Sequence, residues 1–200
     1  TYTSNHSIRV AEGSSMLASR LGYSKKETEL VYRAGLLHDI GKIGVPEDII
    51  NKQGKLSKEE FERVKIHTVL GYHILSGISW DSRIAEAAKY HHERYNGTGY
   101  PNGLTGNNIP EIARIIALAD AYDAMSSTRP YRTARPIEYI KEEIEKNLGE
   151  QFDPVFGKVF IELLDEGKLP GTKKDQKKIL IVDDEPINAE ILKKMISADR

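Results

Sequence analysis

Apolar residues recur at the spacing of an amphipathic α-helix along most of this 200-residue chain, which constrains its fold more than any other feature. A polar segment rich in glycine interrupts the pattern at residues 93–109, and its length is typical of a functional loop. Capping-box sequences that begin at Ser24 and Ser57 mark two helix starts. The sequence therefore predicts an all-α bundle over residues 1–168.

The character of the sequence changes after Gly167. Residues 170–177 are polar and are typical of a linker, which we place at 169–177. Residues 178–200 begin with a short apolar run suited to a buried parallel strand, followed by an acidic pair and a helical pattern. We therefore expect a short strand-helix fragment after the bundle.

The composition excludes several classes of protein. A net charge of -1 gives no general attraction to DNA, so any affinity for an anion must come from a local site. The chain has no cysteine, so a bound metal would be held by histidine and carboxylate. No apolar run approaches the roughly 18 residues that cross a bilayer, and no signal segment opens the chain. We expect a cytoplasmic protein without a membrane segment.

Histidines and aspartates stand where the predicted helices could direct them at one centre. Two divalent ions roughly 3.5–4 Å apart can clamp a phosphodiester and activate water between them. A carboxylate can bridge such ions, and neutral imidazoles complete each shell without repelling phosphate. A single His-Asp pair is often only a surface pair, but here several candidates occur together. The candidate metal ligands are His6, His38, Asp39, His67, His91, His92 and Asp120.

Four segments, in this order, resemble the signatures of the HD-GYP branch of the HD superfamily. They are HDIGKIGVP at residues 38–46, HHER with GTGYPNGL within residues 91–104, the ADAYDA segment within 109–124, and RPYR at 129–132. The resemblance covers roughly residues 1–165 and implies the helical bundle of the HD superfamily. It also implies metal-dependent hydrolysis of cyclic di-GMP to linear pGpG, GMP or both.

The resemblance assigns the candidate ligands to two metal ions. Asp39 would bridge them, with Lys42 stabilising the charge that develops at the scissile phosphate. One shell would be completed by His6, His38 and Asp120, and the other by His67, His91 and His92. Iron or manganese suits these ligands best, while zinc, nickel and magnesium are also compatible.

The resemblance also implies how the substrate is held. Gly99, Tyr100 and Pro101 would line the substrate groove, and the forked guanidinium groups of Arg129 and Arg132 would hold phosphate. In some family members a glutamate four residues before the first histidine helps to hold a third metal. Tyr2 occupies that position here, so we expect two metals and not three. Asn96 replaces an aspartate that many members carry, with a minor effect expected on the loop.

Three polar residues near these motifs have open roles. His73 is expected at a helix surface, Glu93 is either solvated or behind a ligand, and Asp123 either orients a ligand or lies at a helix surface. The fragment at 178–200 resembles the start of a response-regulator receiver domain, with Asp183 and Asp184 as its acidic pair. It would place the bundle in a bacterial two-component signalling protein.

Two other functions stay open at this level. The domain could be a catalytically silent sensor of a cyclic dinucleotide or a protein-interaction module, as expected for members with eroded ligands. It could also be an HD phosphohydrolase that acts on another cyclic dinucleotide, because the Gly-Tyr-Pro loop does not separate guanine from adenine. Expected partners are a cyclic dinucleotide, signalling proteins such as diguanylate cyclases, and a second copy of the chain in a homodimer.

Overall fold

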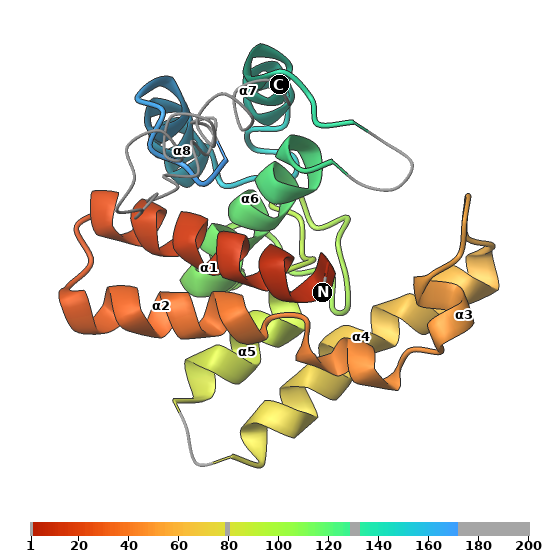
Figure 1. Cartoon of the computed structure of the whole chain (residues 1–200). Helices are drawn as coiled ribbons and strands as arrows, with labels where there is room; N and C mark the ends of the chain where they lie inside the picture. Colours follow the sequence, from red (N-terminus) through yellow and green to blue (C-terminus); the bar gives the residue numbers. More distant parts are fainter. Residues whose placement is uncertain (1, 79–80, 129–132, 172–200) are drawn as a thin grey trace, which may run out of the picture.

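The computed structural model describes residues 2–78, 81–128 and 133–171, and in these ranges the chain is helical apart from its loops (Figure 1). The only β-type pairs in the described ranges are two isolated bridges. The predicted all-α bundle is therefore confirmed. The α-helices are α1 (Tyr2–Arg20), α2 (Lys25–Leu37), α3 (Glu47–Ile50), α4 (Lys58–Ser76), α5 (Ser82–Tyr90), α6 (Glu111–Ser126), α7 (Ile137–Lys146) and α8 (Pro154–Asp165), with 3-10 helices η1 (Ile40–Gly44) and η2 (Gly106–Asn108).

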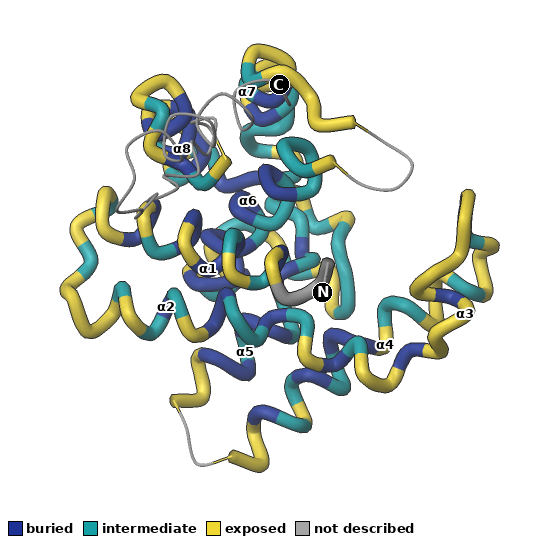
Figure 2. Tube along the Cα trace, viewed as in Figure 1, coloured by how far each residue is buried: buried dark blue, intermediate teal, exposed yellow. Residues whose placement is uncertain are grey.

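The core lies between the facing sides of the helices (Figure 2). Helix α1 packs along α2 and against α6, α4 packs against α5 and η1, and α7 pairs with α8. Burying one large aliphatic or aromatic side chain contributes about 1.5–3 kcal/mol, so this shared core stabilises the helices that carry the polar centre. Its fully buried members include Val10, Leu17, Ile115, Ile116, Leu118, Ile140, Ile144 and Phe160.

Both predicted capping boxes form. The Ser24 hydroxyl oxygen accepts a hydrogen bond from the backbone N–H of Glu27, whose carboxylate accepts one from the backbone N–H of Ser24. Ser57 and Glu60 repeat this exchange at the start of α4. Each box satisfies two N–H groups that a helix start would otherwise leave without partners. The starts of α2 and α4 are therefore fixed by local sequence.

Helix α4 and η1 approach each other so closely that only glycine fits between them. A methyl group at Gly41 would lie 1.9 Å from the carbonyl oxygen of His67 and 2.5 Å from the backbone nitrogen of Gly71. The absence of a side chain at Gly41 thus lets the backbone after Asp39 rest directly on the backbone of α4.

The start of the segment expected as a linker packs on the helical body. Leu169 is buried in the core, and the Tyr122 hydroxyl donates a hydrogen bond of 2.8 Å to the carbonyl oxygen of Pro170. The rest of the expected linker and the receiver-like fragment at 178–200 lie outside the described residues. No helix in the described part of the chain combines the length and apolar character needed to cross a membrane.

Candidate metal centre

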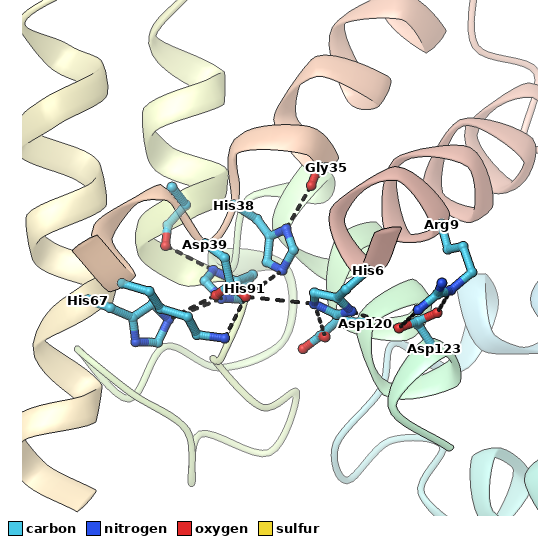
Figure 3. A network of polar contacts seen from close by, with 11 residues as sticks. His6, Arg9, Gly35, His38, Asp39, His67, His91, Asp120 and Asp123 are labelled. Carbon is cyan, nitrogen blue, oxygen red and sulfur yellow. Dashed lines mark hydrogen bonds and ion pairs between the residues drawn. The ribbon is translucent and has the colours of Figure 1, made fainter. Parts of the chain in front are cut away.

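The ends of α2 and α5 and the middle of α4 bring their histidines to one place beside Asp39 (Figure 3). His38 caps the end of α2, Asp39 precedes η1, and His91 caps the end of α5. The candidate ligand atoms form two groups, and within each group all of the atoms lie within 4.8 Å of one another. Asp39 belongs to both groups. One group is Asp39, His67, His91 and His92, and the other is His6, His38 and Asp39.

Backbone carbonyls fix the orientation of three of these rings. In His38, His67 and His91, the Nδ1–H donates to the carbonyl oxygen three residues earlier, at 2.6–2.9 Å. The Nε2 atoms therefore face Asp39, at 3.4, 3.5 and 3.8 Å from its carboxylate oxygens. A metal-binding imidazole is normally held in this way by a partner on its other nitrogen.

Two buried atoms in this cluster lack the hydrogen-bond partners that buried polar atoms normally have. Among the residues that the structure describes, neither His38 Nε2 nor Asp39 Oδ1 has one. A buried polar atom without a partner costs roughly 1–3 kcal/mol, so a bound ion or water that pairs with it would be stabilising. A divalent cation would satisfy both, because imidazole nitrogen and carboxylate oxygen are ordinary ligands for such an ion. The residues present therefore fit a metal.

The electrostatics of the cluster favour the ligand forms of several residues. Burial alone would raise the pKa of Asp39, but the imidazoles of His38 and His6 hold it well below its usual range. Burial lowers the pKa of His92 to about 3 and that of His91 well below its ordinary value. A carboxylate and neutral imidazoles are the forms that bind metal, and the pKa shifts favour these forms in the group of Asp39, His67, His91 and His92. In the other group burial works to lower the pKa of His38, but the carboxylate of Asp39 outweighs it and raises the pKa, so metal binding there must displace a proton.

His6 connects the cluster to a second pair of carboxylates. Its Nε2 lies 3.4 Å from an oxygen of Asp120 and 3.7 Å from one of Asp39, and its Nδ1–H donates to Asp123 at 2.7 Å. Burial works to lower the pKa of His6, but the carboxylates of Asp123 and Asp39 outweigh it and raise the pKa to about 9. The structure thus places Asp120, a predicted ligand, directly beside the group formed by His6, His38 and Asp39.

Asp123 is a buried carboxylate whose oxygens serve three donors. It accepts hydrogen bonds from His6, from the guanidinium of Arg9, and from the Ser127 hydroxyl at 3.0 Å. Of its two open roles, the one behind a ligand fits, because Asp123 is only 1% exposed. The sequence alone assigned no role to Arg9. Its spacing of three residues from His6, which puts both side chains on one face of a helix, was the available signal.

Replacement of Asp123 by asparagine is expected to weaken metal binding by about 10- to 100-fold, as is typical when the partner of a ligating histidine is changed. The amide can still contact the ring of His6 but loses the charge that orients it. Titration of the metal-free protein with Mn²⁺, followed calorimetrically, measures the effect. Ser127→Ala is the matched control, because it removes one donor to Asp123 and keeps the carboxylate. Equal affinity in both variants would contradict the proposed role.

Lys42 lies at the edge of the cluster. Its ammonium group donates to Asp39 at 2.5 Å, and its side chain is 38% exposed. The predicted catalytic pair of Asp39 and Lys42 is therefore in contact, with the lysine on the more open side.

The predicted substrate loop is tied to the cluster by Glu93. This residue is 3% exposed, so the solvated role left open for it is wrong. Its two carboxylate oxygens accept from the backbone N–H groups of Asn102 and Leu104, at 2.7 and 3.0 Å. Within the loop, the Tyr100 ring stacks on His92, with centroids 4.9 Å apart and an interplanar angle of 26°.

Gly99 brings the loop against the backbone next to the paired histidines. A methyl group at Gly99 would lie 2.3 Å from the backbone nitrogen of Arg94. The peptide bond between Tyr100 and Pro101 is cis. Gly99 and Tyr100 line a cavity of about 390 Å³ that also reaches His91, His92 and Asp120. Arg129 and Arg132, the predicted phosphate ligands, lie outside the described residues, and His73 is exposed on α4 as expected.

Curated proteins similar to this chain carry phosphodiesterase names. The 3'3'-cGAMP-specific phosphodiesterase 3 of Vibrio cholerae is 42% identical over 153 residues, covering 76% of this chain and 33% of that protein. The cyclic di-GMP phosphodiesterase of Thermotoga maritima is 42% identical over 165 residues, covering 80% of this chain and 44% of that protein. The chain therefore spans less than half the length of either relative.

Solved structures share the fold. A cyclic GMP-AMP-specific phosphodiesterase from V. cholerae matches with a TM-score of 0.65 at 20% identity, over 90% of this chain and 51% of its own. The HD domain of the L. monocytogenes phosphodiesterase PgpH, in complex with cyclic-di-AMP, matches with a TM-score of 0.62 at 21% identity, over 90% and 94%. The model of the HD domain family matches residues 2–155, most of the chain, and together with the helical fold this shows that the chain belongs to the HD-domain family.

Proposed function

We propose that this domain is a metal-dependent phosphodiesterase of the HD-GYP type that hydrolyses cyclic di-GMP to linear pGpG, GMP or both. The observation that carries the proposal is the pair of ligand groups that share Asp39. A shared carboxylate between two imidazole groups is the arrangement that a two-metal centre needs. The names of the relatives, a cyclic di-GMP phosphodiesterase and a 3'3'-cGAMP-specific phosphodiesterase, support the substrate class.

The residues of the chain have distinct roles in this proposal. Asp39 would bridge two ions, with His6, His38 and Asp120 on one side and His67, His91 and His92 on the other. When bound, divalent ions supply Lewis-acid activation of the phosphodiester and of water. Iron or manganese is the favoured metal on the chemistry of these ligands.

Other side chains would act on the substrate directly. The Lys42 ammonium lies beside Asp39, and from there it would donate to a phosphate oxygen as the negative charge on that oxygen increases. Gly99, Tyr100 and Pro101 would form the groove wall. Arg129 and Arg132 would hold a phosphate, a role that rests on the sequence resemblance alone.

The wider setting also rests on the sequence. The receiver-like pattern at 178–200 supports a place in a two-component protein of the cytoplasm. Diguanylate cyclases and a second copy of the chain are the protein partners that we propose for it. A cyclic dinucleotide other than cyclic di-GMP is the second candidate substrate, because several relatives are named for 3'3'-cGAMP.

The function is tested by measuring bound metal and turnover in the same anaerobic preparation. We expect about two iron or manganese ions per chain and a linear product separable by chromatography. Two bound metals with tight binding of cyclic di-GMP and no product would instead support a silent sensor. Less than one metal per chain after reconstitution would contradict the assignment of the histidine cluster.

Metal binding is also expected to stabilise the fold. An ion that binds only the folded protein adds about 2.7 kcal/mol at a concentration of 100 times its Kd. For a domain of this size, this raises Tm by about 5–10 °C. Thermal unfolding with and without Mn²⁺, after treatment with a chelator, measures the shift. The same comparison in Asp123→Asn should show a smaller shift, whereas Mg²⁺ or Mn²⁺ acting only as bulk salt would affect both proteins equally.

A further inference from the structure

The cavity beside the metal cluster has an outer half in which the proposed function gives a role only to Tyr100. Its volume of about 390 Å³ is within the range of small-molecule sites. The inner wall contains the ligands His91, His92 and Asp120. The outer wall comes from α4, the loop, and the segment before α8, through Phe61, Lys65, Arg94, Thr98, Tyr100 and Gln151.

Aromatic rings and a cation form one side of this outer half. The rings of Phe61 and Tyr100 meet edge to face, with centroids 6.0 Å apart and an interplanar angle of 83°. The Lys65 ammonium lies 5.0 and 5.6 Å from the two ring centroids, and it also pairs with the exposed Glu62 at 2.6 Å. Phe61 is 43% exposed, and both it and Lys65 line the cavity. The cavity wall therefore combines an apolar surface with a cation.

The other polar side chains of the outer half offer mainly hydrogen-bond donors. Arg94 donates one N–H to the side-chain oxygen of Gln151 at 2.9 Å. The Gln151 side chain can therefore offer a ligand the N–H groups of its amide. Glu93 also lines the cavity, and each of its carboxylate oxygens accepts a backbone N–H of the loop. The Thr98 hydroxyl donates to Asn96 at 2.7 Å, which leaves its oxygen as a neutral acceptor.

We propose that this outer half receives a guanine base of the cyclic dinucleotide and disfavours adenine, with Lys65 and Arg94 as the specificity-determining residues. The O6 and N7 atoms of guanine are both acceptors, and Arg or Lys is their commonest partner. Adenine presents an N6 amino donor at the same edge, which would oppose the donors of the cavity. The inference rests on the proposed function and refines its substrate class.

A mixed dinucleotide with one guanine and one adenine exposes this preference directly. With guanine in the cavity, only one of the two phosphodiesters lies at the metal cluster. Water then adds to that phosphorus, the bond to the 3′ oxygen breaks, and the 3′ oxygen takes the proton. One of the two possible linear dinucleotides should therefore predominate by about tenfold, as expected for the roughly 1–3 kcal/mol that such base contacts contribute.

The test compares first-cut products from 3'3'-cGAMP and turnover of cyclic di-GMP and cyclic di-AMP. Lys65→Met keeps the apolar stem and removes the donor, and Arg94→Gln replaces the donor fork by an amide that can also accept from adenine. Both should move the product ratio toward one and raise cyclic di-AMP turnover relative to cyclic di-GMP. Lys89→Met is the matched control. Like Lys65, Lys89 lies over two aromatic rings, here two tyrosines, but it does not line this cavity.

The outcomes separate the inference from the proposed function. Equal amounts of the two linear products from the wild-type protein would overturn the guanine preference and leave the phosphodiesterase activity intact. A ratio that is unchanged in both variants would overturn the assignment of Lys65 and Arg94. If the metal-loaded protein cleaves none of the three dinucleotides, the proposed function fails. In that case the Kd values of the three dinucleotides, measured by calorimetry, test the guanine preference. The preference is overturned if cyclic di-AMP binds as tightly as cyclic di-GMP.

Discussion

Asp39→Asn is expected to lower turnover of cyclic di-GMP by about 10³-fold or more, since a metal centre contributes several kcal/mol to the stabilisation of a transition state. The asparagine has nearly the same shape but lacks the charge that two cations would share. Because Asp39 belongs to both ligand groups, bound metal should fall at both, from about two ions per chain to less than one. Metal analysis and turnover on the same sample measure both effects.

The control for this change is Asp48→Asn, which removes an equal charge from an exposed site on α3. It should bind metal and turn over substrate like the original protein. If Asp39→Asn keeps two metals and full turnover, the shared carboxylate is not the bridge. If it keeps its metals and loses only turnover, Asp39 acts on the substrate and not on the ions.

Gly41→Ala is expected to damage both stability and the metal centre. The added methyl group would meet the carbonyl oxygen of His67, which is backbone and cannot rotate away, so η1 must shift from α4. Overpacking of this kind typically costs about 1–3 kcal/mol, which lowers the Tm of a domain of this size by about 3–10 °C. The shift also separates Asp39 from His67, so metal affinity should fall as well.

Gly77→Ala is the matched control at the end of the same helix. Its φ of -77° suits any residue, and the nearest atoms to an added methyl group are 3.6 Å away. Thermal unfolding and metal titration of the two variants test the contact between η1 and α4. Similar Tm values for both would show that η1 can retreat from α4 without loss.

The helical fold was predictable because its signals are local. The capping boxes at Ser24 and Ser57 and the apolar periodicity depend on residues within a few positions of one another. The paired histidines at 91 and 92 and the His-Asp pair at 38 and 39 could be proposed as ligands for a similar reason. Each pair follows a predicted helix, and a helix end can direct two adjacent side chains toward the same site.

The sequence offered Asp123 and Glu93 as supports of the ligands but left a surface role equally open for each, because their burial depends on contacts between distant segments. His6 and Asp123 are 117 positions apart, and Arg9 meets the same carboxylate across the packed faces of α1 and α6. Glu93 is charged and adjoins the ligand pair, so the sequence allowed a solvated role. Glu93 is buried because the loop folds back over it, so that the backbone N–H groups of Asn102 and Leu104 donate to its carboxylate.

The proposed metal ligands are spread along the chain from His6 to Asp120, and this has a consequence for biosynthesis. A ribosome adds about 5–20 residues per second, so on the order of ten seconds separate the synthesis of the first ligand from that of the last. During that interval the nascent chain holds histidines without the complete set of partners. The proposed pair of ions would therefore bind tightly only after α6 has left the ribosome and packed on α1, so metal loading would report that these two helices have come together.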